Sequence, residues 1–75
     1  MTILKEAYSK VRRQYTVGKI YDCGDFWLFD SSEPLDISAT AVYKENGKQF
    51  EWFPPNLTDE LKQARKRAKE VPIPE

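Results

Sequence analysis

The stretch Ile37–Phe53, with the sequence ISATAVYKENGKQFEWF, decides the fold. At its centre, Asn46-Gly47 is the strongest short signal for a β-hairpin, because both residues of a tight two-residue turn need positive φ. Aromatic and β-branched residues flank this pair, as is typical of strands. The stretch therefore predicts a hairpin with one strand over residues 37–44 and the next over residues 48–53.

A two-residue turn at Asn46-Gly47 also sets the register of this hairpin. The facing pairs are then Glu45 with Lys48, Tyr43 with Phe50, and Ala41 with Trp52. One face carries large apolar side chains together with small alanines, which leave room for a helix to cross it: Ile37, Ala39, Ala41, Tyr43, Phe50 and Trp52. A slip by one residue would bury Glu51 and expose Trp52, so the pattern itself favours this register.

Upstream of the hairpin, residues 19–30 read KIYDCGDFWLFD and are rich in aromatic and branched side chains, which predicts another strand. Neither of its two faces is cleanly polar. This pattern fits either a central strand covered on both sides or a β-bulge that switches the faces midway. We expect the bulge, at Gly24, because Asp22, Gly24 and Asp25 are poor residues for a regular strand interior.

Helices are predicted at both ends of the chain. Near the N-terminus, apolar residues recur at helical spacing up to about residues 14–16, and Thr2 is a plausible N-cap. Near the C-terminus, Thr58 is the expected N-cap of a basic helix that Pro72 ends, leaving an extended tail over residues 72–75. The narrow apolar stripe of this second helix is Leu57, Leu61, Ala64, Ala68 and Val71.

These elements predict a single α+β domain over residues 1–75. It consists of an N-terminal helix, a three-stranded antiparallel meander containing the Asn-Gly hairpin, and a C-terminal basic helix. A chain of 75 residues buries a small core, and four Phe, four Tyr and two Trp supply most of its apolar area. So small a core leaves little room for a deep pocket, so we expect no small-molecule substrate.

Composition disfavours several chemistries. The chain has no histidine, the commonest general base and metal ligand, and Cys23 is its only cysteine. We therefore expect no internal disulfide, no metal, no cofactor and no enzymatic activity. No stretch has the length and hydropathy of a signal sequence or a membrane span, so we expect a cytoplasmic protein that does not act at a membrane.

The net charge is zero, but the charges are segregated along the chain. Residues 1–20 and 61–75 are basic, whereas residues 21–60 carry nine Asp/Glu and two Lys. This pattern fits mutual compensation between the helices and the sheet. It also fits a basic or an acidic face directed at a partner.

Two sets of residues are candidate partner contacts. The first, for another protein or for self-association, joins the acidic stretch to two aromatic residues expected on an uncovered sheet face: Asp22, Asp25, Trp27, Asp30 and Phe53. The second, for nucleic acid, is the basic face of the C-terminal helix, to which Arg12 and Arg13 could add: Lys62, Arg65, Lys66, Arg67 and Lys69. Each set also has a structural reading, as solvated charges, core aromatics or intramolecular compensation.

Three segments together resemble proteins of two groups. They are a short helix carrying Glu6-Ala7-Tyr8, the segment DCGDFWLF over residues 22–29, and AVYKENG over residues 41–47. One group comprises short uncharacterised proteins of bacterial prophages and mobile elements, and the other comprises small immunity-type proteins of bacterial toxin systems. The resemblance covers residues 3–53 and implies a non-enzymatic α+β protein that acts by binding, with no catalytic residues.

The leading hypothesis is therefore a small protein-binding module, such as an accessory, inhibitor or immunity-type protein of a phage or mobile element. The alternative is a nucleic-acid-binding accessory protein that uses the basic C-terminal helix. An enzyme ranks third.

Overall fold

A computed structural model of the chain describes residues 2–32, 39–52, 55 and 57–74. Its elements are α1 (Leu4–Val11), β1 (Val17–Asp22), β2 (Phe26–Ser31), β3 (Ala39–Tyr43), β4 (Gln49–Trp52), α2 (Asp59–Lys66) and β5 (Lys69–Val71). The strands form one antiparallel sheet in the order β4-β3-β2-β1-β5. The predicted α+β class is confirmed, but within the described ranges the sheet has five strands rather than three.

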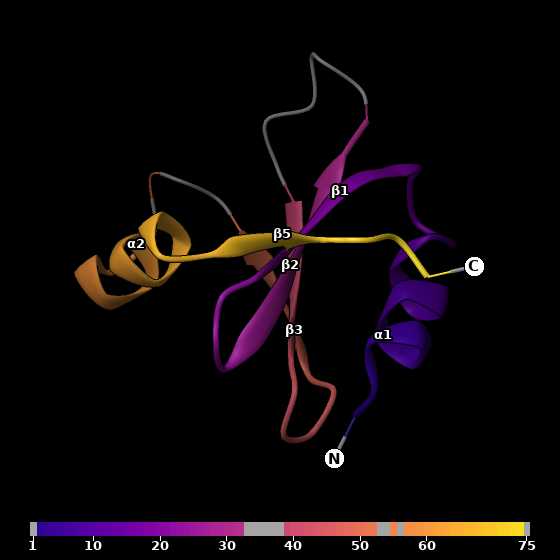
Figure 1. Cartoon of the computed structure of the whole chain (residues 1–75), viewed down its shortest axis with the longest axis horizontal. Helices are drawn as coiled ribbons and strands as arrows, with labels where there is room; N and C mark the ends of the chain where they lie inside the picture. Colours follow the sequence, from indigo (N-terminus) through magenta and orange to yellow (C-terminus); the bar gives the residue numbers. More distant parts are fainter. Residues whose placement is uncertain (1, 33–38, 53–54, 56, 75) are drawn as a thin grey trace.

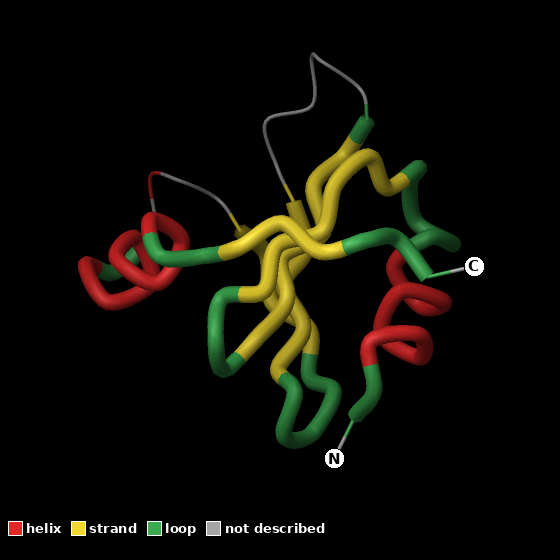
Figure 2. Tube along the Cα trace, in the orientation of Figure 1, coloured by secondary structure: helices red, strands yellow, loops and turns green. Residues whose placement is uncertain are grey.

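The two helices cover opposite faces of this sheet (Figures 1 and 2). On one face, which we call the α1 face, Ala7 and Val11 pack against Ile20, Phe29 and Val42. On the other, the α2 face, Leu61 and Ala64 lie against a second core that is rich in aromatic side chains: Phe26, Leu28, Ala39, Ala41 and Trp52. Within the described residues, no helix has the length and apolar character needed to cross a membrane.

The first four residues of β2, FWLF, are buried on both sides of the sheet, which explains why this run is entirely apolar. Phe26 and Leu28 belong to the core of the α2 face, whereas Trp27 and Phe29 belong to the core of the α1 face. Because successive side chains of a strand point to opposite faces, a strand between two covered faces needs apolar residues at every position.

The single strand predicted over residues 19–30 is in fact a hairpin of β1 and β2, so the bulge expected at Gly24 is wrong. The chain reverses at Gly24, whose φ is +93°, a conformation that glycine adopts at little cost. The Cys23 amide donates to the Phe26 carbonyl at 2.9 Å and closes the turn. The irregular register lies earlier, between Val17 and Lys19. The polar residues within 22–25 therefore form a turn between two strands and do not distort one long strand.

The β3–β4 hairpin forms as predicted, but its register is shifted by two residues. Ala41 faces Phe50 and Ala39 faces Trp52. The loop is longer than two residues: the Gly47 amide donates to the Tyr43 carbonyl, and the Tyr43 amide donates to the Lys48 carbonyl. Among the described residues only glycines have positive φ, which excludes the turn expected at Asn46-Gly47.

A shift by two residues keeps every side chain on its predicted face. Ala39, Ala41, Phe50 and Trp52 all contribute to the core of the α2 face, and Val42 lies on the other face, as expected. Ile37 lies outside the described residues. The prediction that a helix covers the alanine-bearing face is confirmed, and that helix is α2.

Both helices are shorter than predicted. Helix α1 ends at Val11, and the chain then turns so that the Tyr15 hydroxyl donates to the Phe29 carbonyl and accepts from the Thr40 amide at 2.9 Å. Tyr15 therefore joins β2 to β3 instead of extending the helix. The N-cap is Ile3, without a side-chain bond, so the prediction of Thr2 as the cap is wrong.

Helix α2 begins as predicted and ends early. The Thr58 hydroxyl accepts from the Leu61 amide at 3.3 Å, which confirms this N-cap. The helix ends at Lys66, and the chain then pairs with β1 as strand β5, where Val71 faces Ile20. Val71 therefore packs on the α1 face and does not continue the apolar stripe of the helix.

Candidate functional site

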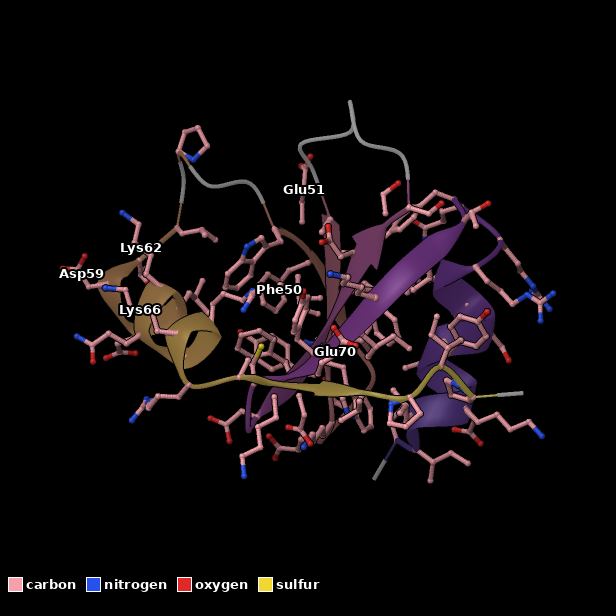
Figure 3. The ribbon with its side chains drawn as sticks, turned by 45° about the horizontal axis from the view of Figure 1, so that its top comes forward. Phe50, Glu51, Asp59, Lys62, Lys66 and Glu70 are labelled. Atoms are coloured by element: carbon pink, nitrogen blue, oxygen red, sulfur yellow. The ribbon has the colours of Figure 1, made fainter. Side chains whose placement is uncertain are left out.

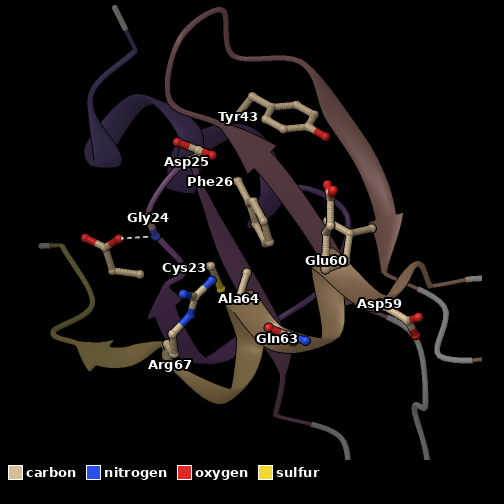
Figure 4. A pocket seen from close by; sticks show the side chains of 12 residues that line it. Cys23, Gly24, Asp25, Phe26, Tyr43, Asp59, Glu60, Gln63, Ala64 and Arg67 are labelled. Atoms are coloured by element: carbon tan, nitrogen blue, oxygen red, sulfur yellow. Dashed lines mark hydrogen bonds between the residues drawn. The ribbon is translucent and has the colours of Figure 1, made fainter.

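An open groove of about 650 Å³ lies between α2 and the β1–β2 turn. We call it the α2 groove. Its apolar side is formed by Phe26 and Tyr43 from the sheet and by Leu61 and Ala64 from the helix (Figure 4). Four carboxylates and one guanidinium also line it: Asp22, Asp25, Asp59, Glu60 and Arg67.

The β1–β2 turn forms one end of this groove. The Asp22 carboxylate accepts from the Gly24 amide at 2.9 Å, an arrangement in which an aspartate stabilises a turn two residues ahead (Figure 4). The turn projects Asp25 into solvent at the rim, while Phe26, the first residue of β2, points into the groove. The residues that interrupt the strand pattern of the sequence are therefore the ones that shape the site.

An ion pair holds this turn to the neighbouring hairpin. Lys44 Nζ donates to Asp22 Oδ1 at 2.8 Å, with 28% of the Lys44 side chain and 36% of the Asp22 side chain exposed. The Lys44 amide also donates to the Asp25 carbonyl, and its ammonium lies 5.3 Å from the centre of the Trp27 ring. Lys44 thus links two segments that are distant in the sequence.

Opposing effects act on the ionisation of Asp22. Partial burial raises the pKa of this carboxyl group, because desolvation disfavours the charged form. The hydrogen bonds from Lys44 and from the Gly24 amide, with the positive charge of Lys44, act in the opposite direction and leave the pKa below its usual value. Asp22 is therefore an anion at neutral pH, and Lys44 partly neutralises it.

The helix side of the groove is fixed by a contact between α2 and β1. The guanidinium carbon of Arg65 lies 3.8 Å from the centre of the Tyr21 ring, within the range of a cation–π contact. This contact and the apolar residues Leu61 and Ala64 anchor the helix to the sheet. Asp59 and Glu60 occupy the first turn of α2, where the helix dipole stabilises negative charge.

Cys23 lines the groove but is not poised for nucleophilic chemistry. Burial raises the pKa of its thiol to about 11, the nearby Arg65 lowers it less, and Asp22 raises it further. A thiol with this pKa is protonated at neutral pH and reacts slowly, because the thiolate is the nucleophile. Within the described ranges, no three His, Cys, Asp or Glu side chains gather as metal ligands would.

The structure brings together only part of the predicted protein-binding set. Asp22 and Asp25 line the α2 groove. Asp30 lies at the far end of β2, facing Lys19 of β1, and is not part of the groove. Phe53 lies outside the described residues.

Trp27, predicted to face a partner, lies in a core. Its side chain is 8% exposed and packs on the α1 face with Ile20, Phe29 and Val42. The prediction assumed that one face of the sheet stays uncovered, but a helix packs on each face. Trp27 is therefore removed from the candidate contacts.

The predicted nucleic-acid set is divided by the structure. Arg65 is held on Tyr21, Arg67 lines the acidic groove, and Lys69 belongs to β5 instead of the helix. Lys62 and Lys66 remain together on the outer side of α2 (Figure 3). Arg12 and Arg13 follow α1 on the other face of the sheet.

Sequence reasoning missed Tyr43, Glu60 and Leu61 as groove residues. Tyr43 was assigned to the core, yet it is 37% exposed, because it is the last residue of β3 and lies beside the groove. Glu60 lies in the first turn of α2 and lines the groove. The available signal was the acidic first turn of α2, but its proximity to the β1–β2 turn depends on tertiary packing.

Comparisons with known proteins find no match to the chain among protein families, curated proteins or solved structures.

Proposed function

We propose that this domain is a non-enzymatic module that binds another protein, and that it holds a cationic, partly apolar segment of that protein in the α2 groove. The observation that carries the proposal is the coincidence of an exposed aromatic side chain, Tyr43, with a rim of carboxylates in the α2 groove. Either feature alone is common on protein surfaces, whereas together they define a chemistry for the partner.

The apolar part of the groove supports contact with aliphatic side chains. Phe26 and Tyr43 meet edge to face, with ring centres 6.1 Å apart. Tyr43 exposes 37% of its surface, and Leu61 on α2 is half-buried on the opposite wall. Aromatic residues that are anchored by neighbours and yet exposed are typical of protein-binding surfaces.

The charged part of the groove supports a cationic partner. Asp25, Asp59 and Glu60 are exposed, and Figure 4 shows the Glu60 side chain extending toward the side of Tyr43. Among the described lining residues, Arg67 supplies the one guanidinium, and the ammonium of Lys44 is paired with Asp22. Complementary charge mainly speeds association and orients the partner, while the apolar contacts supply affinity.

The groove argues against the nucleic-acid alternative, because carboxylates repel phosphates. That alternative now rests on Lys62 and Lys66, which lie outside the groove, together with Lys69 of β5. A non-catalytic role is supported by the protonated thiol of Cys23 and by the absence of histidine from the sequence. The resemblance described above favours an accessory, inhibitor or immunity-type protein of a phage or mobile element, working in the cytoplasm.

The proposal is tested with synthetic peptides and NMR titration of the labelled domain. The probe is an amphipathic peptide that alternates lysine or arginine with leucine, and its counterpart carries glutamate in place of every basic residue. We expect the cationic peptide alone to shift the amide signals of Asp25, Phe26 and Leu61, with a Kd that rises with salt because the attraction is partly electrostatic.

A matched pair of variants locates the binding surface. Glu60→Lys reverses a charge inside the groove and should weaken binding by about tenfold, the equivalent of about 1.4 kcal/mol. Glu6→Lys makes the same charge change on α1, on the other face of the sheet, and should leave binding unchanged. Equal weakening by both substitutions would mean a nonspecific charge effect and would refute the groove as the site.

A second titration addresses the alternative. Single-stranded and duplex oligonucleotides are added to the wild-type domain and to the double variant Lys62→Glu, Lys66→Glu. Under our proposal neither oligonucleotide binds at physiological salt. Binding that falls steeply with salt and is lost in the double variant would support the nucleic-acid function instead.

A further inference from the structure

The sheet has two edges, and they differ in how well they are protected. Strand β4 forms one edge and β5 the other. Strand β5 is three residues long, carries Lys69 and Glu70, and is followed by Pro72 and Pro74. Short length, charge and proline are the devices by which proteins block pairing at an edge. Strand β4, with the sequence QFEW, is followed by Pro54 and Pro55 but is one residue longer than β5 and carries one charged side chain instead of two, so it is the less protected edge.

The register of β4 shows which of its backbone groups face outward. The Tyr43 amide donates to the Lys48 carbonyl, and the pairs Ala41 with Phe50 and Ala39 with Trp52 continue the same alternation. In an antiparallel ladder, hydrogen-bonded and non-hydrogen-bonded pairs alternate. The backbone groups of Lys48, Phe50 and Trp52 therefore point toward β3. The N–H and C=O groups of Gln49 and Glu51 therefore point away from β3, and both residues are exposed.

We propose that two copies of this chain associate by antiparallel pairing of β4 with β4, about a two-fold axis at Phe50. In this register Gln49 faces the partner's Glu51, and Glu51 faces the partner's Gln49. The outward backbone groups of both residues are then satisfied by four hydrogen bonds. The two five-stranded sheets join into one continuous sheet.

The sequence of β4 is complementary to itself in this register. An amide side chain faces a carboxylate twice, and no like charges are opposed. Shifting the partner one way places Glu51 against the partner's Glu51, which is repulsive. Shifting it the other way places Glu51 against the partner's Gly47, whose amide is already bonded to Tyr43.

The side chain of Phe50 also supports a two-fold axis at this residue. It is half-buried on the α2 face, with its ring centre 4.9 Å from that of Tyr43 and 5.4 Å from that of Phe26 (Figure 3). At the two-fold axis Phe50 faces the partner's Phe50 in the closer of the two kinds of antiparallel pair. Pairing therefore covers the exposed part of this ring and joins the two aromatic clusters. Because the axis is perpendicular to the sheet, both α2 grooves open on the same side.

The test is the oligomeric state of the purified full chain, measured by sedimentation equilibrium without any peptide. We expect a monomer–dimer equilibrium with a Kd between about 10 μM and 1 mM, as suits an interface of a few hydrogen bonds and little buried area. A single monomeric species up to about 1 mM would overturn the proposal. Because no ligand is involved, this result is independent of peptide binding in the α2 groove.

Two substitutions at one position test the register. Gln49→Lys places a cation opposite the partner's Glu51 and should tighten the dimer by about 2- to 30-fold, whereas Gln49→Glu opposes two anions and should weaken it by a similar factor. Gln49 accepts a hydrogen bond from the Gln14 side chain at 2.9 Å, and Gln49→Glu keeps that acceptor. Thermal unfolding of dilute samples controls for stability. Equal Kd values for both variants, or the opposite order, would refute this register.

A third variant tests the backbone contacts. Glu51→Pro removes an amide that points away from β3, so β4 stays paired within its own sheet. We expect the dimer to be lost while the monomer keeps its circular dichroism spectrum. A dimer that persists in a folded Glu51→Pro variant would show that copies associate by another surface.

Discussion

Lys44 joins several segments that are distant in the sequence. It forms an ion pair with Asp22 in the β1–β2 turn, its amide bonds to the Asp25 carbonyl, and its ammonium lies near Trp27. In addition, the Thr2 amide donates to the Lys44 carbonyl at 2.8 Å. A single side chain and its peptide group therefore hold the N-terminus, one turn of the α2 groove and the β3–β4 loop together.

The ion pair predicts a dependence of stability on acid. The pKa of Asp22 is lower in the folded chain than in the unfolded chain, so its contribution is complete above the ordinary pKa of about 4 and is lost as pH falls through the lower folded value. We expect Asp22→Asn to flatten the loss of stability below about pH 4. Urea unfolding at pH 2 to 7 measures this slope.

The control for this experiment is Asp25→Asn, in the same turn. Two outcomes would contradict the role of Asp22 in the loss of stability at low pH. One is an equally steep pH dependence in Asp22→Asn and the wild type, and the other is an equal change of slope in Asp25→Asn. Because the pair is partly exposed, we expect the effect to shrink with added salt.

At the scale of elements, α2 is held by few contacts. None of its residues is fully buried, and its attachment consists of Leu61, Ala64 and the stacking of Arg65 on Tyr21. Such a helix is placed by tertiary contacts more than by its own propensity, since eight residues are too few for a stable isolated helix. The position of one wall of the groove therefore depends on Arg65.

A matched pair of substitutions tests this dependence. Arg65→Gln removes the stacked cation and should lower the free energy of unfolding by about 0.5–1 kcal/mol. Lys66→Gln makes a similar change at the next residue, which is exposed, and should be neutral within about 0.5 kcal/mol. Urea unfolding followed by circular dichroism measures both. Equal losses of stability in the two variants would show that the stacking on Tyr21 contributes nothing.

At the scale of the whole molecule, one sheet separates two cores and must support both. Trp27 lies in the core of the α1 face and Trp52 in the core of the α2 face, each 8% exposed. The two cores share strand β2, whose residues alternate between them. We therefore expect them to unfold together, although the side chains on the two faces belong to separate clusters.

Single-tryptophan variants test this cooperativity. Trp27→Phe leaves Trp52 to report on the α2 face, and Trp52→Phe leaves Trp27 to report on the α1 face. In each variant, tryptophan fluorescence and circular dichroism should give the same urea midpoint, because the sheet unfolds as one unit. If fluorescence from one face changes at a lower urea concentration than circular dichroism, that face unfolds separately.

The alternation of residue types and the turn-forming residues were enough to predict several features. The stretch 37–53 predicted a hairpin and the correct faces of Ala39, Ala41, Val42, Phe50 and Trp52, because the alternation of side chains along a strand is a local property. The N-cap at Thr58 was predictable, because the hydrogen bond that its hydroxyl accepts comes from Leu61, only three residues away. The dense aspartates and Gly24 marked a local disruption of the strand pattern, although a full reversal was mistaken for a bulge.

Other features were decided only by tertiary structure. The sequence of β5 continues the apolar spacing of the preceding helix and so predicted more helix. In the structure, Val71 instead pairs with Ile20 of β1, a contact that no local pattern indicates. The burial of Trp27 depends on α1 covering the second face of the sheet, and the α2 groove depends on a helix from the end of the chain meeting a turn from its first third. Local preferences give several conformations of similar free energy, so contacts between distant segments determine which one forms. The same contacts determine where the candidate site lies.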